Sequence, residues 1–260
     1  LETYKCTIEE QEEYTPWIEM GIPVYAGVDY KQILRQAEKE ADIIVWDGGN
    51  NDFSFYKPTL HIVLVDPHRP GHELSYYPGA VNFRNADVII ISKYSTATKE
   101  GIDIVKKNIA ATNPTATVIE ADLVMDVDQP EIIKGKNVLV VEDGPTVTHG
   151  GMAYGAGTLI AQKFHGNIVD GRKYAVGSIR LLYKKYLHLR KILPAMGYSP
   201  EQVKELRETI ERTPCDVIID GTPVNLKRLL HIKKPIVAVN YRLEERGHMA
   251  LVNILKRFRK

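Results

Sequence analysis

Two stretches of the sequence, Val88–Ile91 (VIII) and Val138–Val141 (VLVV), decide the fold. Both are short, rich in β-branched residues and uninterrupted by polar side chains. A strand with one solvated face alternates apolar and polar residues, whereas a strand covered on both faces does not. The two stretches therefore predict buried strands of a mostly parallel sheet that has helices on both faces.

The same kind of run recurs along the chain and alternates with amphipathic stretches. The further predicted strands are 22–26, 43–46, 61–65, 117–120, 217–219 and 236–239. The predicted helices are 30–40, 98–111, 156–164, 200–212 and 243–259. Alternation of strands and helices is typical of α/β proteins.

The length of 260 residues suits one large domain or two ordinary ones, and either can bury a sizeable core. Pro130 and Gly135 interrupt the pattern together with two lysines. We therefore predict two segments, residues 1–130 and residues 131–260.

The net charge of +1 hides an asymmetry between these segments. The net charge is −10 for residues 1–130 and +11 for residues 131–260. A basic half indicates an anionic partner. The alternative is that the two halves offset each other within one molecule. Because no nucleic-acid-binding motif is present, small phosphates are the favoured anions.

Several classes of protein are not indicated. No apolar run approaches the roughly 20 residues of a membrane helix. Cys6 and Cys215 lie far apart and show no metal-ligand spacing, so a reducing, cytoplasmic compartment is expected. The chain begins with Leu1 rather than Met, which leaves open that a segment precedes it.

Ligands of open α/β sheets bind outside the carboxyl ends of the strands, so polar residues that follow a strand are informative. The first such stretch is residues 43–52, IIVWDGGNND. An apolar run that ends in Asp47 resembles a Walker B strand, whose carboxylate orients Mg²⁺ near nucleotide phosphates. The alternative is an aspartate that caps the next turn.

The second stretch, residues 66–73, reads DPHRPGHE. Arg69 could clamp a phosphate, and His68 and His72 could relay protons or bind anions. A metal site that uses both histidines and Glu73 is a further interpretation. The alternative is a rigid polar turn at the surface.

The third stretch, residues 142–157, reads EDGPTVTHGGMAYGAG and leads into the predicted helix 156–164. Backbone N–H groups at a helix start bind anions, and Asp143 and His149 are candidate acid–base or metal-water groups. Neither GxxxxGK[ST] nor GxGxxG occurs in the sequence. The alternative is that the glycines serve packing only.

Motifs along the whole chain resemble the cyclic 2,3-diphosphoglycerate synthetase family, archaeal proteins often described as GTPases. The motifs are 24–30 (VYAGVDY), 46–52 (WDGGNND), 65–74 (VDPHRPGHEL), 141–146 (VEDGPT), 149–152 (HGGM), 174–179 (YAVGSI) and 193–198 (LPAMGY). The resemblance implies a ligase that uses ATP, Mg²⁺ and K⁺ to close 2,3-diphosphoglycerate into its cyclic pyrophosphate. It also implies that residues 1–130 are the later part of a P-loop-NTPase-like domain without its P-loop.

The resemblance further implies roles for single residues. Asp47 would hold Mg²⁺, and Asp47, Asp143 and His149 are the catalytic candidates. The residues that would hold the phosphates are His68, Arg69, His72, Glu73, Gly150, Gly151, Tyr154 and Arg180. Lys93 would stack beneath a base, but Ser95 stands where an Asn-Lys-x-Asp pattern carries its guanine-reading aspartate, which disfavours guanine.

The expected partner is a small anionic phosphorylated substrate, with no nucleic acid and no membrane, and a homodimer is expected because such α/β proteins commonly pair. Two alternatives stay open at this point. The chain could be a non-catalytic regulatory module that binds a phosphometabolite or nucleotide, or a GTPase-like protein.

Overall fold

The structure, a computed structural model, describes residues 2–4, 6, 8–49, 52–148, 151–195, 199–247 and 249–259. The chain divides into two compact units, of which unit 1 comprises Leu1–Val24 and Met125–Tyr241 and unit 2 comprises Tyr25–Val124 and Arg242–Lys260. Each unit thus combines two separate stretches of chain, whereas the sequence predicted consecutive segments that meet at residue 130.

The sheet of unit 1 is parallel and is built around β4. Its strands are β4 (Asn137–Asp143), β5 (Asn167–Ile168), β6 (Leu193–Ala195), β7 (Val217–Gly221) and β8 (Ile236–Ala238). Their order is β5-β4-β7-β8, and β6 also pairs with β4, at its carboxyl end. The runs that predicted β4 and β7 are buried, as expected for strands covered on both faces.

Helices cover both faces of this sheet. Val138 and Val140 pack in one core cluster with Ile160 of α7, whereas Leu139 packs in the other with Ile179 and Ile210 of α8 and α9. The helices of unit 1 are η1 (Glu2–Tyr4), α1 (Ile8–Glu19), η3 (Pro130–Ile132), α6 (Gly144–Thr148), α7 (Ala156–Lys163), η4 (Gly171–Tyr174), α8 (Gly177–Lys185), η5 (Leu187–Leu189), α9 (Pro200–Arg212) and α10 (Leu226–Leu230).

Unit 2 holds a second sheet, of order β1-β2-β3-β9, in which β1, β2 and β3 are parallel. Its strands are β1 (Ile62–Val65), β2 (Val88–Ile91), β3 (Thr117–Asp126) and β9 (Asn240–Glu245), of which the last two residues of β3 and the first two of β9 fall within the bounds of unit 1. In that order β1 lies at one edge, so its second side has no strand neighbour among the described residues.

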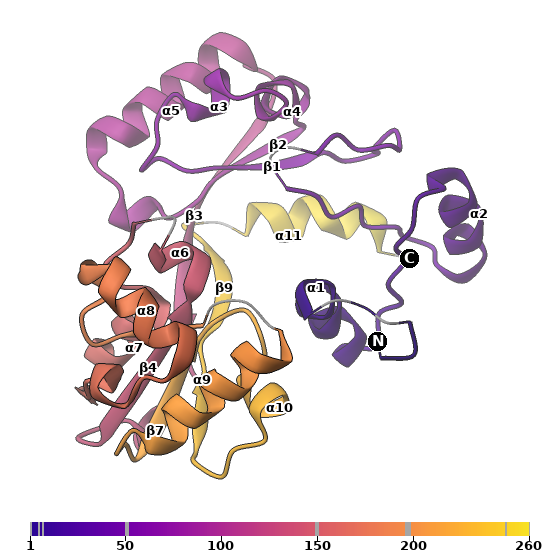
Figure 1. The fold of residues 1–260 in the computed structure, drawn as a ribbon. Helices are drawn as coiled ribbons and strands as arrows, with labels where there is room; N and C mark the ends of the chain where they lie inside the picture. Colours follow the sequence, from indigo (N-terminus) through magenta and orange to yellow (C-terminus); the bar gives the residue numbers. More distant parts are fainter. Residues whose placement is uncertain are drawn as a thin grey trace. The chain divides into compact units, whose positions relative to one another are not determined.

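Unit 2 also has helices on both faces of its sheet, as Figure 1 shows for α4 and α5 on one side and α11 on the other. Ile89 and Ile91 of β2 pack with Val105 of α5, whereas Val88 and Ile90 face α11. The helices of unit 2 are α2 (Tyr30–Glu40), α3 (His72–Ser75), α4 (Gly79–Asn85), η2 (Tyr94–Thr96), α5 (Lys99–Thr112), α11 (Ala250–Leu255) and η6 (Lys256–Phe258).

The predicted fold class is confirmed, because both sheets are mostly parallel and are flanked by helices. Helices 30–40 and 200–212 begin and end where the sequence predicted. Ser199 caps helix 200–212 in a capping box. Its side chain accepts a hydrogen bond from Gln202 N, and the Gln202 side chain accepts one from Ser199 N.

Two predicted strands are wrong. Residues 22–26 and 43–46 form no strand, and the side chains of Ile43 and Val45 are 54% and 80% exposed. Because a strand needs a partner for its backbone hydrogen bonds, an apolar run alone does not make one. The predicted helix 243–259 is also wrong in its first part, because residues up to Glu245 belong to β9.

Among the described residues, no helix combines the length and the apolar character that a bilayer crossing requires.

Candidate functional site

The carboxyl ends of β4 and β7 bring two acidic residues to one edge of the sheet in unit 1. The strands are parallel, and Val141 is paired with Asp220 and Glu142 with Gly221. Glu142 and Asp220 are 1% and 2% exposed. This edge is where open α/β sheets bind their ligands.

Glu142 binds the first turn of α7. Its Oε1 accepts hydrogen bonds from Gly155 N at 3.0 Å and from Thr158 N and Oγ1 at 2.8 and 2.7 Å. Its Oε2 accepts one from Gly157 N at 3.1 Å. A carboxylate here satisfies N–H groups that a helix start leaves unpaired, and it complements the helix dipole. The chain's own carboxylate thus takes the anion position that the sequence assigned to a bound phosphate.

Glycines at the end of β7 and at the start of α7 allow both elements to pack closely around this carboxylate. A Cβ atom on Gly221 would lie 2.5 Å from Glu142 Oε2 and 2.7 Å from Gly157 N. On Gly155 it would lie 2.4 Å from the same Oε2. Packing therefore explains Gly155 and Gly221, whereas a Cβ atom on Gly151 would meet nothing within 4 Å among the described residues.

Asp220 organises the turn that follows β7. Its Oδ1 accepts hydrogen bonds from Thr222 N and Oγ1 at 3.0 and 2.6 Å, and its Oδ2 accepts one from Leu226 N at 3.1 Å. Burial raises the pKa of Asp220 to about 6, and the charge of Glu142 acts in the same direction. Burial also raises the pKa of Glu142, although four hydrogen bonds oppose the shift.

Asp143 is the partly exposed carboxylate of this edge. Its Oδ2 accepts hydrogen bonds from Thr146 N and Oγ1 at 3.1 and 2.6 Å, whereas its Oδ1 bonds to none of the residues that the structure describes. Burial and the negative charges of Glu142 and Asp143 raise the pKa of Tyr241. The edge thus holds three acidic side chains, of which Glu142 and Asp220 are buried and Asp143 is partly exposed.

The other residues predicted for this part of the chain are only partly placed. His149 and Gly150 lie outside the described residues. Gly151 and Tyr154 are exposed, and Arg180 Nε donates to the carbonyl of Ala175 at 3.1 Å. Their predicted roles with phosphates stay predictions.

Unit 2 has its own cluster at the carboxyl ends of β1 and β2. Lys93 Nζ forms an ion pair with Asp66 Oδ2 at 2.8 Å, and His68 Nε2 lies 2.9 Å from Thr96 Oγ1. Burial works to raise the pKa of Asp66, but the bonds from Lys93 and the His68 N–H outweigh it and hold that pKa below its ordinary value. Lys93 thus pairs with a carboxylate, although the sequence assigned it to a base.

Other predicted residues of the 66–73 loop have structural partners. Glu73 accepts hydrogen bonds from Gly71 N at 2.9 Å and from Asn108 Nδ2 at 2.7 Å. The ring of His72 lies 4.8 Å from that of Tyr76. Arg69 is exposed. Within the described residues no group of three His, Cys, Asp or Glu side chains is placed to hold a metal ion.

The sequence did not predict a neighbouring cluster around Asp122. Ser95 N and Oγ donate to the two oxygens of Asp122, each at 2.6 Å. Arg246 pairs with Asp122 at 3.0 Å and lies over the ring of Tyr94 at 5.0 Å. No sequence signal finds this cluster, because Asp122 and Arg246 are 124 residues apart.

The Walker B interpretation of Asp47 lacks its structural basis. Residues 43–46 are not in a strand, and Asp47 is exposed. The residues around it therefore do not fit the Mg²⁺ role that the sequence indicated.

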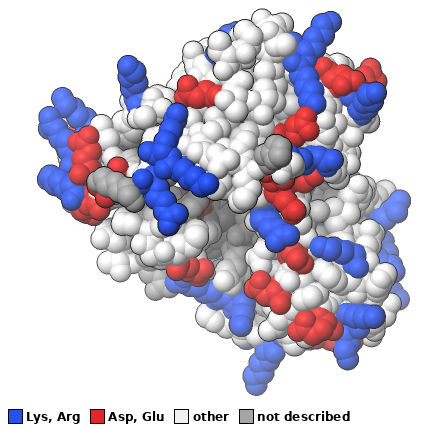
Figure 2. All heavy atoms as spheres, turned by 180° about the vertical axis from the view of Figure 1, so that it is seen from behind, with Lys and Arg blue, Asp and Glu red and all other residues white. Residues whose placement is uncertain are grey.

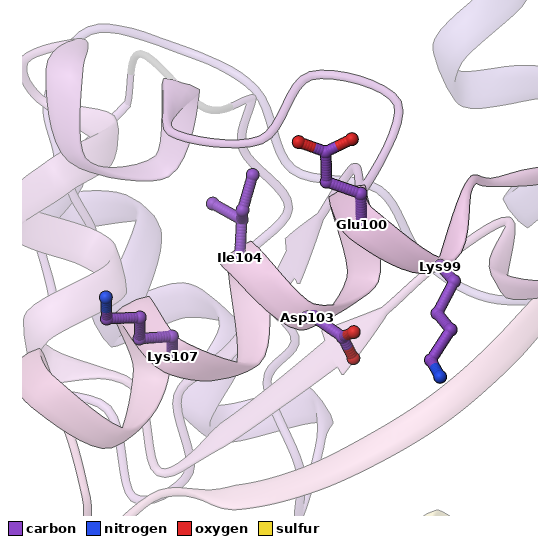
Figure 3. A pocket seen from close by; sticks show the side chains of 5 residues that line it. All are labelled: Lys99, Glu100, Asp103, Ile104 and Lys107. Carbon is purple, nitrogen blue, oxygen red and sulfur yellow. The ribbon is translucent and has the colours of Figure 1, made fainter.

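One hollow at the surface of unit 2 lies along a single helix. Figure 3 shows an open hollow of about 410 Å³ along α5, lined by Lys99, Glu100, Asp103, Ile104 and Lys107. All five residues belong to one helix, and the four charged ones are two basic and two acidic residues. Lys and Arg side chains also lie interspersed with Asp and Glu on the face shown in Figure 2. These features do not define a phosphate site.

No family model matches the chain. The chain is 62% identical over 261 residues to a protein from Thermococcus kodakarensis that is named Arginine synthetase ArcE. The match covers 100% of this chain and 58% of that protein. The chain thus spans little more than half the length of the curated relative.

This relative corrects the predicted function. Its name states the synthesis of arginine, so the prediction that the chain cyclises 2,3-diphosphoglycerate is wrong. The alternatives, a non-catalytic phosphometabolite module and a GTPase-like protein, gain no support from it. The prediction of a synthetase-type enzyme agrees with the name of the relative. Short motifs after strands indicate an α/β scaffold with polar loops. They do not fix the substrate, because the same scaffold serves many substrates in different proteins.

Proposed function

We propose that this chain is part of an arginine-forming synthetase. The observation that carries the proposal is the 62% identity to the Thermococcus kodakarensis protein along the entire chain. Identity at this level, maintained over both units, supports a shared reaction more strongly than any single motif.

Synthetases couple bond formation to the cleavage of a nucleoside triphosphate. We therefore infer ATP as co-substrate, and Mg²⁺ would enter on its phosphates, because Mg²⁺ usually keeps several waters and needs only one or two carboxylates. K⁺ and a homodimer stay predictions from the sequence.

The contribution of unit 1 is to bind a cationic group of arginine or of its amine precursor. A guanidinium or ammonium group donates charge-assisted hydrogen bonds to a carboxylate oxygen, and such bonds are about twice as strong as neutral ones. Asp143 supplies a partly exposed carboxylate whose Oδ2 is fixed by Thr146. Glu142, the preceding residue of β4, adds negative charge to the same strand end and is itself held by α7. The site thus selects a cation, where the sequence predicted anions.

Calorimetry of L-arginine binding tests the proposal on the purified chain, with the Thermococcus kodakarensis protein as positive control. We expect Asp143→Asn to weaken binding at least 10-fold. Asp216→Asn is the matched control, because Asp216 precedes β7 and lies at the opposite end of the same sheet. The control should bind arginine as the unmodified chain does.

Two results would overturn the proposal. If the chain binds no L-arginine at concentrations that saturate the Thermococcus kodakarensis protein, the shared function is wrong. If Asp143→Asn and Asp216→Asn bind equally well, the assignment of the site to the carboxyl edge is wrong.

A further inference from the structure

Tyr241 lies just beyond the carboxyl ends of the strands in unit 1. Ala238, the last residue of β8, pairs with Asp220, and Val239 N donates to the carbonyl of Asp220 at 2.8 Å. The chain therefore runs alongside the end of β7 and reaches Tyr241 two residues later. Because β4 pairs with β7 up to the residue before Asp143, this course brings Tyr241 to the edge of the sheet that holds Asp143.

The backbone that leads to Tyr241 is anchored, whereas its side chain is open. Val239 is 8% exposed and packs in a core cluster of unit 1, and Asn240 Nδ2 donates to Asp128 Oδ1 at 2.9 Å. The side chain of Tyr241 is 53% exposed. It makes no hydrogen bond, ring contact or cation contact with the other residues that the structure describes. An anchored segment thus presents an aromatic ring that the chain itself does not use.

The carboxylates of this edge act on the ring. The pKa of Tyr241 is raised by burial first, and then by the negative charges of Glu142 and Asp143. The phenol is therefore neutral at physiological pH, and its ring keeps the negative face that attracts cations. Within the described part of the chain, no Lys, Arg or His side chain forms an ion pair with Glu142 or Asp143. The carboxylate and the ring are thus both available to a cation from outside.

A guanidinium and an ammonium group use a carboxylate and a ring differently. The guanidinium is planar, its N–H groups lie in the plane, and its faces stack on aromatic rings. It can therefore donate to a carboxylate and lie on a ring at the same time. The ammonium is a compact and strongly hydrated charge, which must give up water or a carboxylate bond to approach the ring. A carboxylate next to an exposed tyrosine therefore favours the planar group.

We propose that Tyr241 is a specificity-determining residue of this site, and that its ring stacks on the guanidinium of arginine while Asp143 accepts hydrogen bonds from it. This inference rests on the proposed function, and it decides between the two cationic groups named there. The site holds the guanidinium that an arginine-forming reaction makes, and it discriminates against the unreacted amine. The selectivity comes from the face of the ring and not from the hydroxyl.

Calorimetry with L-arginine and L-lysine tests the selectivity on the purified chain. We expect Tyr241→Leu to weaken arginine binding about 5- to 10-fold and lysine binding less than about 2-fold, because only the guanidinium stacks on the ring. Tyr4→Leu is the matched control, since Tyr4 belongs to the same unit and is 85% exposed in η1. The control should leave both affinities unchanged.

A spectroscopic signature separates stacking from a structural role. Arginine should perturb the near-ultraviolet absorbance of a tyrosine in the unmodified chain. Tyr241→Phe keeps a ring, so it should bind arginine within about 2-fold of the unmodified chain and should lack this difference spectrum. Because Tyr241→Phe removes only a hydroxyl group, this readout does not depend on whether Tyr241→Leu folds.

Three results would overturn the inference alone. Equal arginine affinities of Tyr241→Leu and Tyr4→Leu would show that the ring does not contact the ligand. Equal losses of arginine and lysine affinity in Tyr241→Leu would remove the selectivity. The same difference spectrum in Tyr241→Phe would assign the perturbed tyrosine elsewhere. In each case Asp143→Asn can still weaken arginine binding, so the proposed function stands, whereas a chain that binds no arginine overturns both.

Discussion

Two apolar runs that are each followed by an acidic residue differ in structure, because one forms a buried strand and the other does not. The run Val138–Val141 forms the centre of the sheet in unit 1, is fully buried, and is followed by Glu142, which binds the start of α7. The run Ile43–Trp46 in unit 2 has no strand partner among the described residues and is followed by the exposed Asp47. Composition thus gives a segment the capacity to be a strand, whereas a strand partner decides whether it becomes one.

The same isoleucine truncation in the two regions gives the largest expected contrast. Ile218 is 0% exposed in β7, so Ile218→Ala should lower the free energy of unfolding by about 3 to 5 kcal/mol through lost burial and a cavity. Ile43→Ala should change it by less than about 0.5 kcal/mol. Urea unfolding of the two variants measures both values. A similar loss in the two would mean that residues 43–46 are already packed in the chain.

A glycine substitution sharpens the contrast at the strand ends. Gly221→Ala places a methyl group 2.5 Å from Glu142 Oε2 and 2.7 Å from a backbone nitrogen, so we expect about 3 kcal/mol of destabilisation. Among the described residues, the same change at Gly49 meets Asp52 Oδ2 alone, at 3.4 Å, and should cost less than about 0.5 kcal/mol. Thermal unfolding measures the stability of the two variants. If Gly221→Ala is as stable as the unmodified chain, the space around the Glu142 carboxylate is not as tight as described.

The pH dependence of stability probes the buried carboxylates of unit 1. Burial raises the pKa of Asp220 from 3.8 to about 6, so the folded state holds this proton more tightly than the unfolded chain does. Its contribution to stability is therefore present below pH 4 and is lost as the pH rises to about 6. The loss is about 3 kcal/mol at most. Between pH 4 and pH 7, the free energy of unfolding should fall less steeply with pH for Asp220→Asn than for the unmodified chain. The same pH dependence in both proteins would show that Asp220 does not titrate in this range.

The sequence predicted the elements that are determined locally. Helix 30–40 forms where expected because its hydrogen bonds lie within the segment, and Asp29 caps it through Gln32 N. The runs of β2 and β4 formed strands because both faces and both sides are covered. Residues 43–46 have the same kind of apolar run but form no strand, because strand pairing depends on a partner elsewhere and is not a local property.

The candidate site could be predicted only in part. The sequence singled out Asp143 because it follows an apolar run, and the structure places it at the end of β4, while its role stays a prediction. The role of Glu142 could not be found, because it depends on amide groups 13 to 16 residues away in another element. A glycine-rich turn before a helix indicates an anion site, and nothing in the sequence says that the anion is the chain's own carboxylate.

Hydrogen exchange of the purified chain tests the central claim most directly, because it reports the pairing of every backbone amide. We predict that the amides of Val138–Val141 and Val217–Ile219 exchange only on global unfolding, whereas those of Ile43–Trp46 exchange at least 1,000-fold faster, near the rate of an unpaired loop. Protection of residues 43–46 equal to that of β4 would contradict the account.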